Sequence, residues 1–210
     1  MIRKYVPLFL TLFRLIASPL LLPLLLVYFA PFNIMIVNVL LGSFFALLSI
    51  TDFLDGYFAR RFDAITALGR ILDPIADKIL ILSALISLVA IGKLFFLWAV
   101  LFIAREFFVM GLRLLAAEYS LDIPVSLGAK FKTAAQMIFI TIVIINPYVG
   151  TTIANIGFKN TIDTIQTIAL FVALFLSLYS AYRYYRSFYA RMLSPRTTTQ
   201  PKKELSELHD

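Results

Sequence analysis

Six long apolar segments, separated by short polar stretches, constrain the fold of this chain most strongly. They cover residues 15–30, 33–53, 69–91, 94–117, 133–148 and 161–182. A helix needs about 20 apolar residues to cross the hydrocarbon core of a bilayer, and its backbone polar groups must be bonded inside the chain. The pattern therefore predicts an all-α integral membrane protein with six transmembrane helices.

Composition supports this class and excludes others. Of the 210 residues, 61% are hydrophobic and only 15% are charged, whereas a soluble domain is about half apolar and a quarter charged. The chain has no Cys, so neither disulfides nor thiol chemistry are available to it. The net charge of +7 is typical of membrane proteins with basic cytoplasmic loops, and no nucleic-acid partner is expected.

The distribution of Lys and Arg predicts the orientation. With six spans, one side of the membrane holds both termini and two of the connections, and it collects 17 of the 19 basic residues. The other side holds only Lys93, interpreted as an interfacial anchor, and Lys159. Because basic residues concentrate on the cytoplasmic side, we expect a multi-pass protein of the inner (cytoplasmic) membrane with both termini in the cytoplasm.

The two ends of the chain differ from its apolar body. Residues 1–14 mix basic and apolar side chains, which predicts a helix lying in the membrane interface. Residues 191–210 are basic, then rich in polar residues, and are expected to form a flexible cytoplasmic tail. Residues 1–190 are then expected to form a single membrane-embedded domain.

Four acids lie at the ends of the second and third apolar segments. Asp52 and Asp55 are three residues apart and share a helix face, and Asp73 and Asp77 are four apart and share another. Acids at membrane helix ends are costly unless they face water, a cation or a partner. Hard oxygen ligands without His or Cys favour Mg²⁺ or Mn²⁺, and four carboxylates could hold two such ions around a diphosphate.

The residues between the acids fit the same interpretation. Gly56 and Ala59 are small enough for two membrane helices to approach closely, and Arg60 can grip a phosphate with two hydrogen bonds. The alternative is that the acids are solvated loop or capping residues. Four at this spacing, with Arg60 between them, favour the metal and phosphate site.

The whole stretch resembles a known signature. The pattern D-x2-D-G-x2-A-R-x8-G-x3-D-x3-D is met in full, and it is similar to that of the CDP-alcohol phosphotransferases. Its positions are Asp52, Asp55, Gly56, Ala59, Arg60, Gly69, Asp73 and Asp77. The resemblance implies a six-helix membrane enzyme of phospholipid biosynthesis, often a homodimer, in which a CDP-linked lipid such as CDP-diacylglycerol donates its phosphatidyl group to an alcohol and CMP leaves.

The resemblance also implies roles for individual residues. All four aspartates resemble metal ligands, and Asp77 also resembles the proton acceptor for the attacking alcohol. The segment from Pro7 to Arg14 is similar to the entry segment of one subfamily, although Leu8 replaces the usual Asn. The expected CDP-diacylglycerol contacts are Asp52, Gly56, Arg60, Thr66, Gly69, Asp73, Thr11 and Arg14.

Four cations outside the signature bear on the acceptor. Arg105, Arg113, Lys130 and Lys132 together suggest an acceptor that carries its own phosphate, and their clusters resemble those of the subfamily that uses sn-glycerol 3-phosphate. The alternatives are an ion pair between Arg105 and Glu106 or another buried acid, and ordinary cytoplasmic anchoring by the lysines. An inositol phosphate or phosphatidylglycerol acceptor would share the acidic core.

Two rival classes remain open at this point. Acids inside membranes also mark the pathways of cation transporters, but such a path needs acids on the outer half too, where only Asp163 lies. A purely structural membrane protein would leave the four aspartates without a role. The sequence therefore favours the enzyme.

Overall fold

The regular elements of the described chain are all helices. The computed structural model describes residues 13, 15–61, 67–121, 127–147 and 161–193, with the side chains at 52–61, 67–74, 77 and 127–130 outside the description. The elements are η2 (Ala17–Leu21), α2 (Leu22–Phe29), η3 (Ala30–Phe32), α3 (Met35–Arg61), α4 (Ala67–Ala90), α5 (Phe96–Glu118), α6 (Leu127–Ile145) and α7 (Thr161–Leu193). Since this part of the chain contains no strand, the all-α prediction is confirmed for it.

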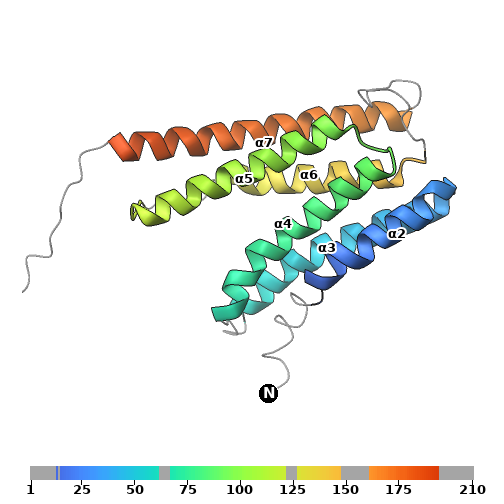
Figure 1. Cartoon of the computed structure of the whole chain (residues 1–210), viewed down its shortest axis with the longest axis horizontal. Coiled ribbons are helices and arrows are strands. Elements are labelled where there is room, and N and C mark those ends of the chain that lie inside the picture. Colours follow the sequence, from blue (N-terminus) through green and yellow to red (C-terminus); the bar gives the residue numbers. More distant parts are fainter. Residues whose placement is uncertain (1–12, 14, 62–66, 122–126, 148–160, 194–210) are drawn as a thin grey trace, which may run out of the picture.

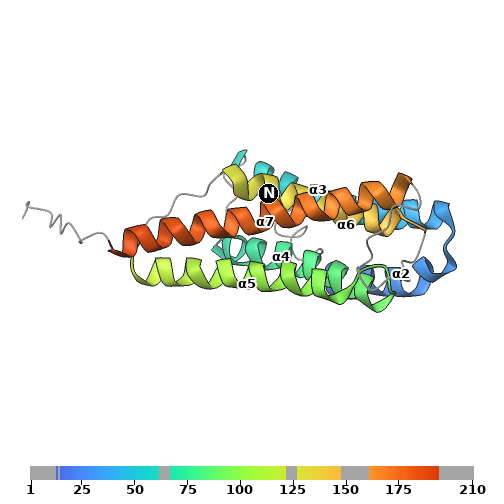
Figure 2. The ribbon, with the colours of Figure 1, turned by 90° about the horizontal axis from the view of Figure 1, so that it is seen from above.

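The helices pack as two layers of three. One layer contains α2, α4 and α5, and the other contains α3, α6 and α7, as Figures 1 and 2 show from the front and from above. Contacts of α5 with α7, and of α4 with α6 and α3, join the layers. Phe45, Phe102, Phe139, Leu85 and Ile140 are fully or almost fully buried in the apolar core between them.

The first apolar segment is helical but irregular. Residues 17–21 form one π-helical turn that contains Pro19, and Pro23 lies in the first turn of α2. Proline has no N–H to give to an α-helical ladder, so it is tolerated in a first turn and distorts the chain elsewhere. Pro31 lies in the closing 3-10 turn, after which Asn33 adopts a left-handed conformation (φ 55°) and ends the segment.

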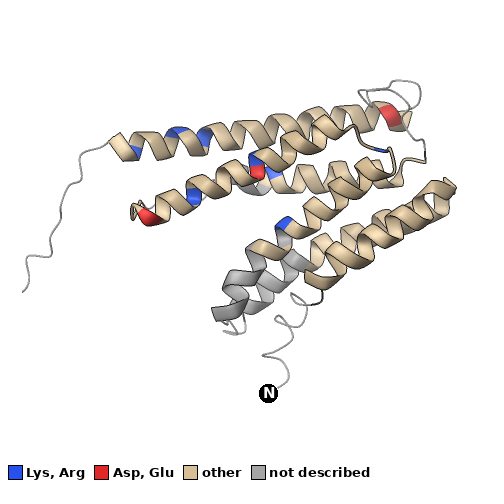
Figure 3. Cartoon of the chain, in the orientation of Figure 1, with Lys and Arg blue, Asp and Glu red and all other residues tan. Residues whose placement is uncertain are grey.

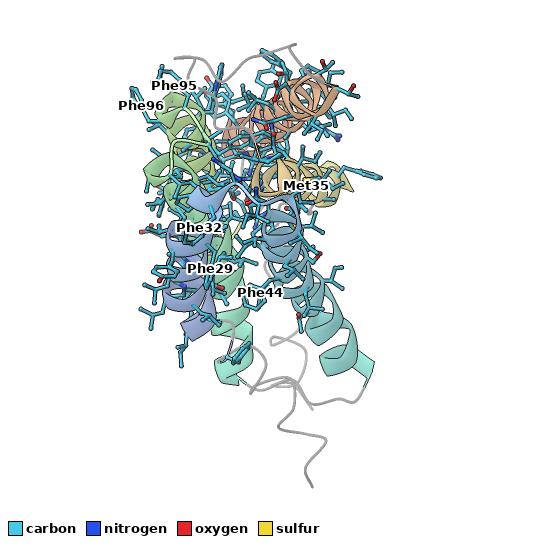
Figure 4. All side chains as sticks on the ribbon, turned by 90° about the vertical axis from the view of Figure 1, so that its right-hand side faces the viewer. Phe29, Phe32, Met35, Phe44, Phe95 and Phe96 are labelled. Atoms are coloured by element: carbon cyan, nitrogen blue, oxygen red, sulfur yellow. The ribbon has the colours of Figure 1, made fainter. Side chains whose placement is uncertain are left out.

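The surface of the bundle is far more apolar than that of a soluble protein, and several polar side chains are buried. Leu24, Ile36 and Phe175 are about two-thirds exposed, and Phe32 and Met35 lie exposed at the end of the bundle seen in Figure 4. The buried polar side chains include Ser18, Asn38, Ser49, Ser87, Gln136, Thr167, Ser177 and Ser180. Apolar surface of this extent suits a hydrocarbon environment rather than water.

Among the described residues, α7 is the one helix both long enough and apolar enough to cross a membrane. Four further apolar stretches are shorter: Ala17–Phe32, Met35–Thr51, Lys78–Ala90 and Phe131–Ile145. The remaining helix, α5, carries Arg105, Glu106 and Arg113, and these charged residues interrupt its apolar run. By this measure the described chain has one clear candidate span.

The last helix is longer than the sequence predicts. A helix over 161–182 is expected, but α7 continues to Leu193, and at about 1.5 Å per residue it is roughly 50 Å long. The extension is packed against α5, because Phe188 is buried with Leu112 and Ala116 in a second apolar cluster. The predicted tail therefore begins as helix, and residues 194–210 lie outside the described part.

Candidate functional site

The acidic signature lies on two helices that contact each other. Asp52, Asp55, Gly56 and Arg60 belong to α3, while Gly69, Asp73 and Asp77 belong to α4. Their side chains lie outside the described part of the structure, as do Thr11, Arg14 and Thr66 altogether. Among the described side chains no group of three or more His, Cys, Asp or Glu residues forms a candidate metal site. The chemistry of the aspartate oxygens still fits Mg²⁺ or Mn²⁺.

A buried ionic cluster follows directly on this signature. At its centre, Oε1 of Glu106 in α5 accepts a hydrogen bond from Nη1 of Arg105 at 2.9 Å. Nζ of Lys132 in α6 donates to the same oxygen. The second carboxylate oxygen, Oε2, lies 4.0 Å from Nζ of Lys78 in α4. We call Lys78, Arg105, Glu106 and Lys132 the cation cluster.

The members of the cation cluster differ in how deeply their side chains are buried. The side chains of Arg105 and Lys132 are only 7% and 5% exposed, whereas those of Glu106 and Lys78 are 15% and 23% exposed. A buried charge without a partner is strongly destabilising, so Glu106 compensates the two deeper cations. The cluster is most open on the side of Glu106 and Lys78.

Arg105 is also fixed to the other layer of the bundle. Its Nε donates to the carbonyl oxygen of Ser177 at 2.9 Å, and its Nη2 donates to Oγ of Ser180 at 3.1 Å. Because Nη1 donates to Glu106, all three guanidinium nitrogens have partners. Because the guanidinium is planar and rigid, these bonds hold Arg105 in one place between α5 and α7.

The cation cluster has an excess of positive charge. Three cations surround one carboxylate, so its formal charge is +2. Lys78 directly follows Asp77 of the acidic signature in α4, so the cluster and the signature share this helix. Among the residues that Figure 3 colours, charged positions are sparse, and most of those on α5 and α7 lie toward the C-terminal ends of these helices.

The four predicted acceptor contacts are only partly brought together. Arg105 and Lys132 meet at Glu106, whereas Arg113 is exposed two turns further along α5, with its guanidinium carbon 5.7 Å from the centre of the Tyr184 ring. The side chain of Lys130 lies outside the described part. The alternative interpretation of Arg105, an ion pair with Glu106, is present in the structure, and its role toward an acceptor stays a prediction.

Two polar groups near the cation cluster have unused hydrogen-bonding capacity. Gln136 lies one helical turn after Lys132, is fully buried, and has no hydrogen-bond partner for either side-chain atom among the described residues. The Oγ of Ser177 is also buried and has no hydrogen-bond partner among the described residues. Buried polar groups normally have partners, so these atoms fit a region that receives water or a polar ligand.

The sequence assigned no role in the site to Glu106, Lys78 or Ser180. A signal for Glu106 was present, because an acid beside an arginine in an apolar helix must find a cation. Nothing in the sequence pointed to Ser180, whose bond to Arg105 spans 75 positions. That contact depends on how α5 and α7 pack.

A second polar network lies at the other end of the bundle. Lys93, between α4 and α5, is 3% exposed, and its Nζ donates to the carbonyl oxygens of Ile144 at 3.0 Å and Asn146 at 2.8 Å. It therefore caps the C-terminal end of α6 rather than anchoring at a surface, and burial lowers the pKa of its amine to about 8. Nδ2 of Asn146 donates to Oδ1 of Asp163 at 3.0 Å, which gives the one outer acid a structural partner.

Comparison with known proteins agrees with the signature. The family model for CDP-alcohol phosphatidyltransferase matches residues 4–193, and the chain belongs to this membrane-associated family. Similar proteins include three named CDP-diacylglycerol–glycerol-3-phosphate 3-phosphatidyltransferase. The one from Rickettsia bellii is 38% identical over 68% of this chain and 75% of its own length. The one from Rickettsia prowazekii is 36% identical over 89% of this chain and 96% of its own length. The one from Bacillus subtilis is 34% identical over 67% of this chain and 69% of its own length.

Proposed function

We propose that the protein transfers the phosphatidyl group of CDP-diacylglycerol to sn-glycerol 3-phosphate, which gives phosphatidylglycerophosphate and CMP. Family membership and the names of the similar proteins support this reaction. The observation that carries it is the cation cluster, with a formal charge of +2, next to Asp77 of the acidic signature. A donor site for a diphosphate and an acceptor site for a phosphate then adjoin on α4.

The aspartates and their neighbours would serve the donor. Asp52, Asp55, Asp73 and Asp77 would hold divalent ions, Mg²⁺ or Mn²⁺ and two in number, which supply positive charge to the pyrophosphate when bound. Arg60 would contact a phosphate oxygen. Gly56, Gly69, Thr66, Thr11 and Arg14 complete the proposed donor contacts.

The chemical step is a substitution at the lipid-linked phosphorus. The primary hydroxyl oxygen of glycerol 3-phosphate bonds to this phosphorus, and the bond from phosphorus to the oxygen of the departing CMP breaks. Asp77 would accept the hydroxyl proton, which requires it to lie within hydrogen-bonding distance of the acceptor.

The charge of the cation cluster favours a phosphomonoester acceptor. A phosphomonoester carries nearly two negative charges at neutral pH, which matches the +2 of the cluster, whereas the phosphodiester of phosphatidylglycerol carries one. Arg105 and Lys132 would contact the phosphate, and Arg113 and Lys130 would attract it from the cytoplasmic side. Because an inositol phosphate carries the same group, it stays the alternative acceptor.

The membrane arrangement is also part of the proposal: six spans in the inner membrane, with the site and both termini in the cytoplasm, and a homodimer as in other members of the family. The exposed face of α7 supports the cytoplasmic interface, since it changes from apolar residues such as Phe175 to Tyr and Arg. A shallow hollow of about 380 Å³ lies there, of a size to receive a lipid headgroup. It is lined by Tyr179, Tyr182, Arg183, Arg186, Ser187 and Ala190.

CMP release from purified protein tests the proposal. The detergent-solubilised protein is given CDP-diacylglycerol and Mg²⁺, with glycerol 3-phosphate, inositol phosphate, phosphatidylglycerol or no acceptor. The proposal requires CMP release with glycerol 3-phosphate and little with the other additions. Release with inositol phosphate alone would select the alternative acceptor, and no release with any alcohol would refute the enzyme.

A further inference from the structure

We infer that Glu106 is a positioning residue of the acceptor site: its carboxylate occupies the cations there, and the phosphate of the acceptor competes with it for Lys132 and Arg105. This inference rests on the proposed function, which supplies the phosphomonoester. It adds a residue that neither the acidic signature nor the predicted acceptor contacts contain.

The hydrogen bonds show how Glu106 holds its cationic neighbours. A single oxygen, Oε1, accepts from both Arg105 and Lys132, and Oε2 faces Lys78 at 4.0 Å. These are the bonds that a phosphate oxygen would make with the same donors. The carboxylate therefore holds the buried amine of Lys132 and the guanidinium of Arg105 in position, and it occupies donors that the ligand needs.

The three cations differ in their freedom to change partners. Arg105 is bonded to Ser177 and Ser180 of α7 as well as to Glu106, so it stays in place. Lys132 carries its amine on a flexible four-carbon chain and can turn from the carboxylate to an incoming oxygen. The carboxylate itself lies on the more exposed side of the cation cluster, which is the side from which a ligand must arrive.

The charge of the cation cluster makes the inference quantitative. It is +2 in the native protein, becomes +3 when Glu106 is replaced with Gln, and becomes +1 when Lys78 is replaced with Gln. Gln retains an oxygen that can accept a hydrogen bond from Lys132, so Glu106→Gln removes the competing charge with little change of shape. One unit charge a few ångströms from a phosphate changes its affinity by roughly tenfold or more at the effective dielectric of partly buried sites.

The test is a series of variants in which only this charge changes. The apparent KM for glycerol 3-phosphate and the inhibition constant of inorganic phosphate are measured for the native protein, Glu106→Gln, Glu106→Asp and Lys78→Gln. Glu118→Gln is the matched control, because it makes the same charge change at an exposed position near the end of α5, two helical turns and more from the cluster. The KM for CDP-diacylglycerol reports whether the donor site is intact.

We expect both constants to fall roughly tenfold in Glu106→Gln and to rise roughly tenfold in Lys78→Gln, with Glu106→Asp and Glu118→Gln close to the native values. A KM that is unchanged or raised in Glu106→Gln overturns the inference. If Glu106→Gln does not fold, an unchanged KM in Lys78→Gln overturns it instead. Absence of CMP release by the native protein with glycerol 3-phosphate instead refutes the proposed function.

Discussion

Replacement of Lys132 with Met should be among the most destabilising single changes in this protein. The Met side chain fills nearly the same volume but removes the cation that donates to Oε1 of Glu106. Because the Lys132 side chain is 5% exposed and that of Glu106 15%, the carboxylate loses a buried partner and keeps Arg105 as its one close cation. Breaking a buried pair in this way costs about 3–5 kcal/mol.

The structure provides an internal comparison for this magnitude. Lys78 also faces Glu106, but its Nζ lies 4.0 Å from Oε2 and its side chain is 23% exposed. Pairs of this kind contribute about 0–1 kcal/mol, so Lys78→Met should destabilise the protein several times less than Lys132→Met.

A second variant identifies the cause. If the loss arises because the Glu106 carboxylate lacks its Lys132 partner, Glu106→Gln combined with Lys132→Met should recover about 1–2 kcal/mol, within the range of coupling energies between contacting residues. The free energy of unfolding is measured for each protein in mixed micelles of a mild detergent and dodecyl sulfate. Equal destabilisation by Lys132→Met and Lys78→Met, or no recovery in the double variant, would contradict the role of Glu106 described here.

Other perturbations probe the donor site, the acceptor and the second polar network. Asp52→Asn, Asp73→Asn and Asp77→Asn should each abolish CMP release from folded protein, and normal turnover by a variant would remove the role proposed for that residue. Chelation of divalent ions should also abolish CMP release, and added Mg²⁺ should restore it. Arg113→Gln should raise the apparent KM for glycerol 3-phosphate and leave that for CDP-diacylglycerol unchanged. The Lys93 amine has a pKa of about 8 in the folded protein and 10.5 ordinarily. Between pH 8 and 10.5 the unfolded chain therefore binds more protons than the folded protein, so the free energy of unfolding should rise with pH in this range. Lys93→Met should flatten that rise in the melting temperature, and an equal rise in the variant would assign it to other groups.

Much of the fold could be predicted because it depends on the local pattern of apolar residues. Each apolar segment became a helix, and Pro19, which has no N–H, lies in the irregular π-helical turn of the first one. The length of α7 was underestimated, since its last turns are stabilised by Phe188 packing on α5, a contact with residues about 70 positions away in the chain.

The side-chain partners were less predictable, because they depend on tertiary packing. Arg105 and Lys132 were predicted together as acceptor contacts, and the structure brings both to Glu106, but this common partner is defined only when α5 and α6 are adjacent. Lys93 was interpreted as a surface anchor, yet its loop folds over the end of α6 and buries it. Composition and spacing therefore identify the chemistry of a site, and the packing of the helices identifies which groups meet.

The central claim is the transfer of a phosphatidyl group to glycerol 3-phosphate, and one measurement tests it most directly. Glycerol 3-phosphate labelled in its glycerol carbon is incubated with the purified protein, CDP-diacylglycerol and Mg²⁺, and the label that enters the lipid extract is counted beside the CMP released. We predict one labelled lipid molecule for each CMP. CMP release with the label remaining in water-soluble form would contradict the claim, because the phosphatidyl group would then have gone to another acceptor.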